Sequence, residues 1–241
     1  MEFIIDNVSK TIKSRQILKN VSMHLTDGQC IGFVGPNGAG KTSLTRTILG
    51  LYSCEQGKIT MDGKNVSELD YSKEEERLCF LLDTAGLMRM LTVEENIEFF
   101  YRYYNKSFTA KQMKEDIERI LEEVKLLDYR KDNIRNLSRG MKQRLAIGRT
   151  MVTTPKFFIM DEPYLGLDVE AQFFLSAYIK KLREQGCAIL ISAHDLGHLE
   201  KICNGIYFIK KGEIVTYEKI PENCEKDYLE NLYIKWIGIE G

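Results

Sequence analysis

Short apolar runs separated by turn residues dominate the first quarter of the chain, which is the pattern of β-strands and hairpins. These runs predict strands over 3–8, 17–25, 30–34 and 58–61, with turns at Asp27-Gly28 and Asp62-Gly63. The N-terminal part of the chain is therefore expected to be rich in β-structure.

From Thr92 to Thr154 the apolar residues change to the spacing of amphipathic helices. Thr92 forms a capping box with Glu95, and Thr109 is the expected N-cap of a long helical segment. Apolar residues then recur at helical spacing, at Met113, Ile117, Ile120, Leu121, Val124 and Leu127. Such stripes indicate a helical core rather than a cofactor site.

Strand and helix patterns alternate again in the last third of the chain. They predict a strand over 157–160, a helix over 169–185 that Gly186 ends, a strand over 187–192 and a hairpin at Lys211-Gly212. Apolar residues between Tyr228 and Trp236 predict a short amphipathic helix packed on its own domain. A helical insertion thus separates two parts of an α/β fold.

Composition excludes several classes of protein. The 241 residues carry 34 basic and 35 acidic side chains, and this balance argues against strong nonspecific binding to nucleic acid. The six cysteines lack zinc-site spacing and are predicted to be reduced core residues of a cytosolic protein. No apolar run approaches the roughly twenty residues of a membrane span, and the N-terminus lacks a signal-peptide pattern. Any membrane contact is expected to pass through another chain.

A glycine-rich motif follows the expected strand at 30–34. Gly35-Pro36-Asn37-Gly38-Ala39-Gly40-Lys41-Thr42 fits G-x-x-x-x-G-K-[ST], and a helix is expected from 44 to 49. In this setting the backbone N–H groups of the loop converge on phosphates, and the helix N-terminus adds about half a positive charge. Lys41 adds a point charge, and Thr42 offers a hydroxyl to Mg²⁺. The motif predicts a nucleotide site that includes Ser43.

Three later segments carry chemistry that fits such a site. Ser138 opens a helix within Leu137-Ser138-Arg139-Gly140-Met141, and its simplest interpretation is an N-cap. The strand at 157–160 ends in Asp161-Glu162, at the strand end where ligands bind in open α/β sheets. His194 follows the run 188–192 to the same edge of the sheet, although a lone histidine there is more often structural.

Together these motifs resemble the nucleotide-binding subunit of an ABC transporter over nearly the whole chain. Leu137 to Met141 is similar to the family signature Leu-Ser-Gly-Gly-Gln, Phe157 to Glu162 to its Walker B strand, and Leu165-Gly166-Leu167-Asp168 to its D-loop. The resemblance implies an α/β P-loop NTPase core with an N-terminal antiparallel β subdomain and an inserted α-helical subdomain.

The resemblance also implies domain limits. We expect an ABC ATPase domain over 1–217, with the helical subdomain at about 84–154. A short C-terminal helical tail is expected over 218–241.

The family's site residues map onto matching positions of this chain. Asp161 would hold Mg²⁺ through water, and Glu162 would act as the base or orient the water that attacks the γ-phosphate. His194 would be the switch histidine that senses the γ-phosphate. Ser138 and Gly140 would contact the γ-phosphate of ATP held by a partner chain.

Some positions depart from the family pattern. Asp83 stands where the family has a glutamine that contacts Mg²⁺ and water, and we expect it to reach the metal through water while slowing hydrolysis or changing coupling. Ile12 stands where an aromatic residue commonly stacks on adenine, so we expect modest discrimination of ATP from GTP. Tyr164 replaces a small polar residue, and Met141 replaces the last glutamine of the signature.

The resemblance implies that two chains face each other head to tail, as a homodimer or heterodimer, and close two ATP sites. Lys41 and Mg²⁺ would hold the γ-phosphate on one side, and the Ser138 helix of the partner would hold it on the other. Hydrolysis at Glu162 would then let the pair open.

The leading hypothesis for the whole protein is an ATP-hydrolysing subunit of a separate transmembrane permease. Gly140-Met141-Lys142-Gln143-Arg144 is a spelling familiar from bacterial exporters, which favours export. The chain would be cytoplasmic, held on the inner face of the cell membrane by the permease, with no nucleic-acid partner. The alternative is a soluble ABC ATPase that remodels a protein or nucleic-acid partner. A plain nucleotide kinase would leave the signature and Glu162 unexplained.

Overall fold

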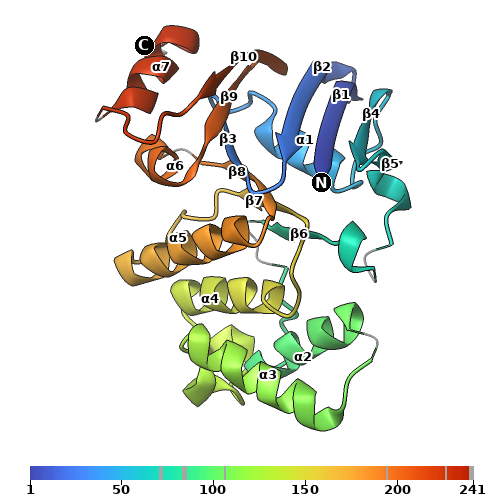
Figure 1. The fold of residues 1–241 in the computed structure, drawn as a ribbon, viewed down its shortest axis with the longest axis vertical. Helices are drawn as coiled ribbons and strands as arrows, with labels where there is room; N and C mark the ends of the chain where they lie inside the picture. The colour runs from blue at the N-terminus through green and yellow to red at the C-terminus, as the bar shows by residue number, and fades with distance from the viewer. Residues whose placement is uncertain (71–72, 83–85, 106, 194, 226, 239–241) are drawn as a thin grey trace.

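The computed structural model describes residues 1–70, 73–82, 86–105, 107–193, 195–225 and 227–238, and Figure 1 shows the arrangement of their elements. A mixed sheet crosses the middle of the molecule, with strand order β10-β9-β3-β8-β7-β6. β3, β6, β7, β8 and β9 run parallel, and β10 pairs antiparallel with β9. The strands are β3 (Cys30–Val34), β6 (Leu78–Leu81), β7 (Phe157–Asp161), β8 (Ala188–Ser192), β9 (Gly205–Lys210) and β10 (Glu213–Lys219).

An antiparallel sheet with strand order β2-β1-β4-β5 covers one side of the mixed sheet. Its strands are β1 (Glu2–Ile12), β2 (Arg15–Thr26), β4 (Gln56–Met61) and β5 (Lys64–Asn65). Helix α1 (Lys41–Ile48) lies between the two sheets, because Leu44 and Ile48 belong to the core cluster that also contains Phe3 and Phe157. The rings of Phe3 and Phe157 stack with centroids 3.8 Å apart, so the two sheets share a continuous apolar core.

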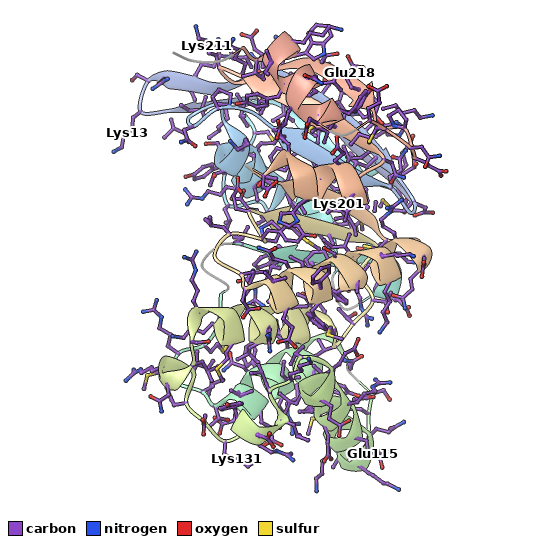
Figure 2. All side chains as sticks on the ribbon, turned by 90° about the vertical axis from the view of Figure 1, so that its left-hand side faces the viewer. Lys13, Glu115, Lys131, Lys201, Lys211 and Glu218 are labelled. Carbon is purple, nitrogen blue, oxygen red and sulfur yellow. The ribbon has the colours of Figure 1, made fainter. Side chains whose placement is uncertain are left out.

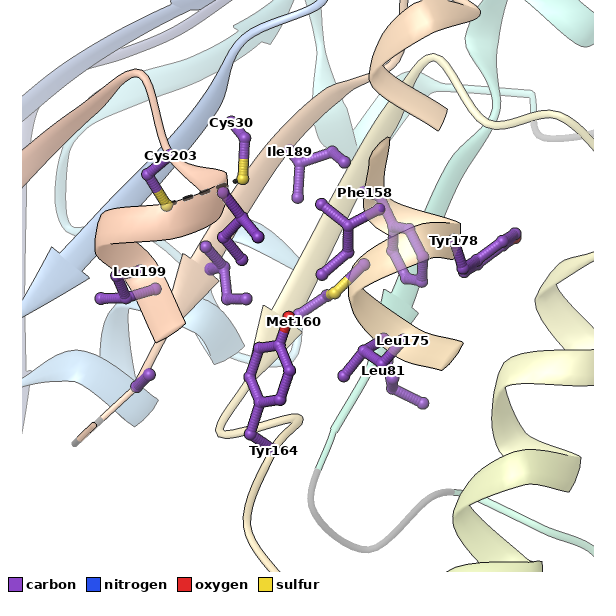
Figure 3. Packing of buried hydrophobic residues seen from close by; sticks show 14 of the residues in the cluster. Cys30, Leu81, Phe158, Met160, Tyr164, Leu175, Tyr178, Ile189, Leu199 and Cys203 are labelled. Atoms are coloured by element: carbon purple, nitrogen blue, oxygen red, sulfur yellow. Dashed lines mark hydrogen bonds between the residues drawn. The ribbon is translucent and has the colours of Figure 1, made fainter. Parts of the chain in front are cut away.

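The opposite face of the mixed sheet is covered by α5 (Val169–Glu184), α6 (Leu196–Ile202) and α7 (Tyr228–Trp236). Figure 3 shows Phe158, Met160 and Ile189 from the strands meeting Leu175 and Tyr178 of α5. Neighbouring residues of β7 alternate between the two core clusters, since Phe157 and Ile159 belong to the first and Phe158 and Met160 to the second. This is why the strand is apolar at every position before Asp161.

A third apolar cluster holds together the helices α2 (Val93–Tyr104), α3 (Ala110–Glu123) and α4 (Arg139–Thr150) at one end of the molecule. Short 3-10 turns occur at Val66–Glu68, Glu74–Glu76, Leu127–Tyr129 and Ile134–Asn136. Charged side chains cover the outside, as Glu115 and Lys131 do at the helical end and Glu218 at the other end (Figure 2).

Most elements predicted from the apolar pattern are confirmed, including the capping box at Thr92 and the N-cap at Thr109, which also forms a capping box with Gln112. The helical stripe ends earlier than its apolar residues suggested. Val124 is already the C-cap of α3, Lys125 has a left-handed φ of 56°, and Leu127 lies in a 3-10 turn while still packing on the helical cluster. The turn keeps the hydrophobic contact without continuing the helix. The domain division at 217 and 218 stays a prediction, and β10 extends to Lys219.

Cys30, Cys79, Cys187 and Cys203 are buried free thiols, and Cys54 and Cys224 are half-buried. Burial raises the pKa of Cys79 to about 12, which keeps it a neutral core thiol. Cys30 Sγ lies 3.7 Å from Cys203 Sγ (Figure 3). Among the residues that the structure describes, no helix is both long and apolar enough to span a bilayer.

Candidate functional site

At two positions of the loop between β3 and α1, the backbone leaves no room or no allowed conformation for a residue other than glycine. A Cβ on Gly35 would lie 2.0 Å from the carbonyl oxygen of Ile209 in β9, closer than atoms can approach. Gly40, the N-cap of α1, has a φ of 112°, a backbone conformation that residues other than glycine rarely adopt. The loop therefore runs tightly against β9 and presents the N-terminus of α1 to the space above it.

Lys41 places its ammonium group at the base of this loop. Its Nζ donates hydrogen bonds of 2.6 Å to Gly35 O and 3.3 Å to Pro36 O. Burial lowers the pKa of Lys41, and the carboxylates of Glu162 and Asp161 oppose that shift. The Lys41 side chain is thus held between the phosphate loop and the end of β7.

A cavity of about 320 Å³ lies over the loop. Its lining comes from the β1–β2 hairpin, the phosphate loop, the start of α1 and the end of β7: Arg15, Ile17, Asn37, Gly38, Ala39, Gly40, Lys41, Thr42, Ser43 and Glu162. The predicted residues 37–43 thus line one space, while Gly35 and Pro36 do not line it and instead accept hydrogen bonds from Lys41. Ile12 does not line the cavity; Arg15 and Ile17, which the sequence did not indicate, do.

Asp161 and Glu162 lie in different surroundings at the end of β7. Asp161 is buried and accepts a 2.5 Å hydrogen bond from Ser192 Oγ of β8. Glu162 has a left-handed φ of 51°, unusual for a residue with a side chain. Its backbone N–H donates to Ser192 Oγ at 3.1 Å and to Ser192 O at 3.2 Å. One serine of β8 therefore fixes both carboxylate residues.

Ser138 is the N-cap of α4, as predicted, and its Oγ accepts a 3.2 Å hydrogen bond from the N–H of Met141. Neither Ser138 nor Gly140 is among the described residues that line the phosphate-loop cavity. A second cavity, of about 410 Å³, lies beside the start of α4 and is lined by Arg139, Lys142 and Gln143. Glu162 lines both cavities, so it stands between the phosphate loop and the signature helix.

The D-loop residues join the signature helix to α5. Asp168 is the N-cap of α5 and accepts a 2.8 Å hydrogen bond from the N–H of Ala171. Arg144 of α4 lies 3.2 Å from Glu170 Oε2 and 3.7 Å from Asp168 Oδ1. Gln143 Nε2 donates to the carbonyl oxygen of Pro163 at 3.3 Å. The signature helix and the residues after Glu162 are therefore tied together within one chain.

The predicted roles of His194 and Asp83 fall on positions outside the described residues. Both roles stay predictions from the sequence.

The oxygen donors present suit Mg²⁺ better than a transition metal. Within the described ranges, no group of His, Cys, Asp and Glu side chains is arranged to cage a metal ion by itself. Mg²⁺ typically takes only one or two carboxylates and completes its octahedron with water and phosphate oxygens. Asp161 with the hydroxyl of Thr42 fits that donor set.

A phosphate loop and an acidic strand end on one sheet edge define a P-loop nucleotide-binding protein of α/β type. An additional helical unit carries a capped helix beside the acidic pair. Residues 18–165 match the family model described as ABC transporter, and the chain belongs to that family. It is an ABC ATPase.

Several curated relatives are similar over most of both chains. The chain is 30% identical to the lipopolysaccharide export system ATP-binding protein LptB of Haemophilus influenzae, over 95% of each chain. It is 32% identical to the uncharacterized ABC transporter ATP-binding protein YhcH of Bacillus subtilis, covering 92% of this chain and 72% of that one. It is 30% identical to the linearmycin resistance ATP-binding protein LnrL of Bacillus subtilis, covering 92% and 70%.

Solved structures agree with the fold. The ATP-binding cassette MJ0796, solved as a dimer in a post-hydrolysis state with ADP and Pi, matches with a TM-score of 0.81 and 25% identity. That match covers 91% of this chain and 99% of MJ0796. An ATP-binding subunit of an ABC transporter matches with a TM-score of 0.86 at 23% identity, covering 98% of this chain and 99% of that one.

Proposed function

We propose that this chain is the ATP-hydrolysing subunit of an exporter, docked from the cytoplasm on a separate transmembrane permease. The observation that carries the catalytic part is the placement of Glu162, which lines the phosphate-loop cavity together with Lys41 and Thr42. The export direction is supported by the signature spelling Gly140 to Arg144 and by the names of LptB and LnrL.

The residues divide the chemistry of phosphoryl transfer between them. The backbone N–H groups of residues 37–43 and the Lys41 ammonium bind the β- and γ-phosphates. Glu162 accepts a proton from the attacking water or orients it. Thr42 and Asp161 would hold Mg²⁺, and the ion would supply positive charge beside the phosphate oxygens.

A second copy of the chain supplies what one chain lacks at this cavity. Ser138 and Gly140 do not line the phosphate-loop cavity of their own chain. Their helix N-terminus, with Arg139 and Lys142 beside it, forms an anion-binding surface. We infer that two chains assemble head to tail, so that each signature helix meets the ATP of the other. A heterodimer with a related chain would use the same contacts.

The Arg15 side chain is the best candidate to contact the base. It lies on the wall of the cavity beyond the phosphate loop, and a planar guanidinium stacks on a purine ring. Ile17 supplies an apolar contact beside it. We propose these residues, in place of Ile12, as the nucleoside end of the site.

The test of this function is Glu162→Gln, which removes the base while keeping the shape of the side chain. We expect ATP turnover to fall by at least about a hundredfold and ATP to hold the protein as a stable dimer in gel filtration with light scattering. The matched control is Glu184→Gln, an exposed residue at the C-terminal end of α5 that does not line the cavity. Normal hydrolysis by Glu162→Gln, or a monomer in ATP, would contradict the proposal.

The transporter part needs its own measurement. Affinity purification of the full chain from membranes should bring down a membrane-spanning protein, and vesicles holding both should move cargo away from the ATP-binding side. Recovery of only soluble protein or nucleic-acid partners would favour the alternative of a soluble remodelling ATPase.

A further inference from the structure

Tyr164 occupies the inside of the turn that follows Glu162, at the position where the sequence departs from a small polar residue. Its side chain is only 6% exposed and belongs to the core cluster under α5 and α6. Figure 3 shows the ring rising from the loop toward Met160, with Leu199 of α6 on the far side of the cluster. The aromatic ring therefore anchors the loop in the core.

The hydroxyl group of Tyr164 is fixed on α5. Its oxygen lies 2.9 Å from Ser176 Oγ, which itself donates to the carbonyl oxygen of Gln172 at 2.9 Å. Since Ser176 uses its proton there, the phenol is the donor in the first bond. Burial raises the pKa of Tyr164 to about 12, so the phenol keeps its proton across the physiological range.

The ring of Tyr164 is stacked on His198 of α6. The two centroids are 4.2 Å apart and the planes differ by 5°. His198 Nε2 lies 3.7 Å from Asp195 Oδ2, and Asp195 Oδ1 accepts a 2.9 Å hydrogen bond from the N–H of Gly197 as the cap of α6. Tyr164 thus contacts the first turn of the helix that begins just after the strand β8.

The same turn sets the backbone of Glu162. The N–H of Leu165 donates to Glu162 O at 3.1 Å, and the N–H of Leu167 donates to Tyr164 O at 3.2 Å. A shift of Tyr164 therefore moves both the carboxylate residue before it and the D-loop after it. No other ring stacks on Tyr164 among the described residues.

We propose that the Tyr164–His198 stack makes the D-loop turn and α6 move as one unit, and that both are positioning residues for ATP hydrolysis. The proposal rests on the role assigned to Glu162 above. The phosphate loop lies on other elements. We therefore expect the stack to affect the position of Glu162 and the rate of hydrolysis, but not the affinity for ATP.

Steady-state ATPase kinetics on matched substitutions test this. Tyr164→Phe and His198→Phe keep a planar ring in the stack, and we expect kcat within about twofold of the parent. Tyr164→Thr and His198→Ala remove one ring, and we expect kcat to fall about tenfold with KM for ATP within about twofold. A rise in KM well beyond twofold, or an unchanged kcat, would overturn the positioning role.

A double substitution shows whether the two rings act together. If the stack is one unit, Tyr164→Thr combined with His198→Ala should lower kcat no further than the worse single change, within about twofold. Effects that multiply to about a hundredfold would contradict it. Tyr217→Thr is the control, because it breaks the Tyr207–Tyr217 ring pair, 4.7 Å between centroids, in the β9–β10 hairpin. It should leave kcat unchanged.

Backbone hydrogen exchange, read by mass spectrometry, gives a result that does not depend on activity. We expect Tyr164→Thr to speed exchange in residues 196–203 and His198→Ala to speed it in residues 163–168, with both Phe variants like the parent. Unchanged exchange rates in both segments would contradict the stack proposal, regardless of the ATPase activity of Glu162→Gln. Normal hydrolysis by Glu162→Gln would instead refute the role of Glu162, and the hydrogen-exchange result would still test whether the stack couples the two segments.

Discussion

Ser192 Oγ donates a 2.5 Å hydrogen bond to Asp161 Oδ1, joining the ends of two neighbouring parallel strands. The same hydroxyl oxygen accepts the N–H of Glu162 at 3.1 Å. Ser192 is fully buried, so both bonds form away from solvent, where an unpaired group is costly. This serine aligns the proposed metal ligand with the proposed base.

Replacing Ser192 with alanine leaves the Asp161 carboxylate without this donor and the Glu162 N–H without this acceptor. We expect the free energy of unfolding to drop by about 1–3 kcal/mol and the Mg²⁺ concentration for half-maximal ATPase to rise severalfold. Urea unfolding and a Mg²⁺ titration of activity measure the two effects. Ser67→Ala, at an exposed 3-10 turn, is the control and should change neither. A variant as stable and as Mg²⁺-sensitive as the parent would count against this role.

Arg15→Ala should weaken ATP binding without removing it. Arg15 lines the cavity, and in the proposed site its guanidinium stacks on the base while the phosphate loop keeps its own contacts. We expect the Kd for ATP to rise about fivefold to tenfold, the low end of the range for stacking on a base. Titration calorimetry measures this, with Lys13→Ala, exposed on the same hairpin, as control. If Arg15→Ala bound ATP as tightly as the parent, Arg15 would not be the base contact and Ile12 would again be the candidate.

A guanidinium stacks on either purine, so the chain should distinguish ATP from GTP only modestly. We expect less than about a tenfold difference between the two Kd values, because stacking alone reads no base edge. Competition of GTP against a fluorescent ATP analogue gives the ratio directly. A larger preference for ATP would show that another contact reads the adenine.

These cases show what the sequence could and could not predict. The strands and the phosphate loop were predictable, since period, glycine spacing and capping residues are local signals. Arg15 was not, because it reaches the cavity through the pairing of β1 with β2 and the packing of that hairpin over α1. Ser192 gave no signal of its own, since its role depends on the register that sets Asp161 opposite Ser192.

The ion pairs of Glu94 should make the free energy of unfolding depend on pH in the acid range. Its carboxylate accepts from Arg130 and, at 2.6 Å, from Lys131, and the bond with Arg130 is the main reason its pKa lies below the ordinary value of 4.5. A carboxylate with a lowered folded pKa adds stability above its unfolded value and loses it as the pH falls through the folded value. Glu94→Gln should therefore cost about 1 kcal/mol at pH 7, and its difference from the parent should shrink as the pH falls below 4.5 through the lowered folded pKa of Glu94.

Thermal melting between pH 3 and 7 measures that difference. Glu98→Gln on the same helix is the control, because its pair with Arg102 at 2.6 Å is more exposed and should add only about 0.3–0.5 kcal/mol. A constant gap between Glu94→Gln and the parent at every pH would show that the loss is not due to charge.

Gly35→Ala should damage the phosphate loop through a single added methyl group. The added carbon would meet the carbonyl oxygen of Ile209 at 2.0 Å, and neither backbone can retreat without moving β3 or β9 out of the parallel pair. We expect a loss of about 3 kcal/mol or more in unfolding free energy, with ATP affinity lowered at temperatures where the variant is still folded. Gly197→Ala in α6 is the matched control, because its added carbon would meet only a side-chain oxygen, Asp195 Oδ1, at 3.2 Å. Urea unfolding and ATP titration of both variants measure the effect. If Gly35→Ala lost no more unfolding free energy or ATP affinity than Gly197→Ala, the loop would tolerate the methyl group, and its close approach to β9 would not be what shapes the cavity.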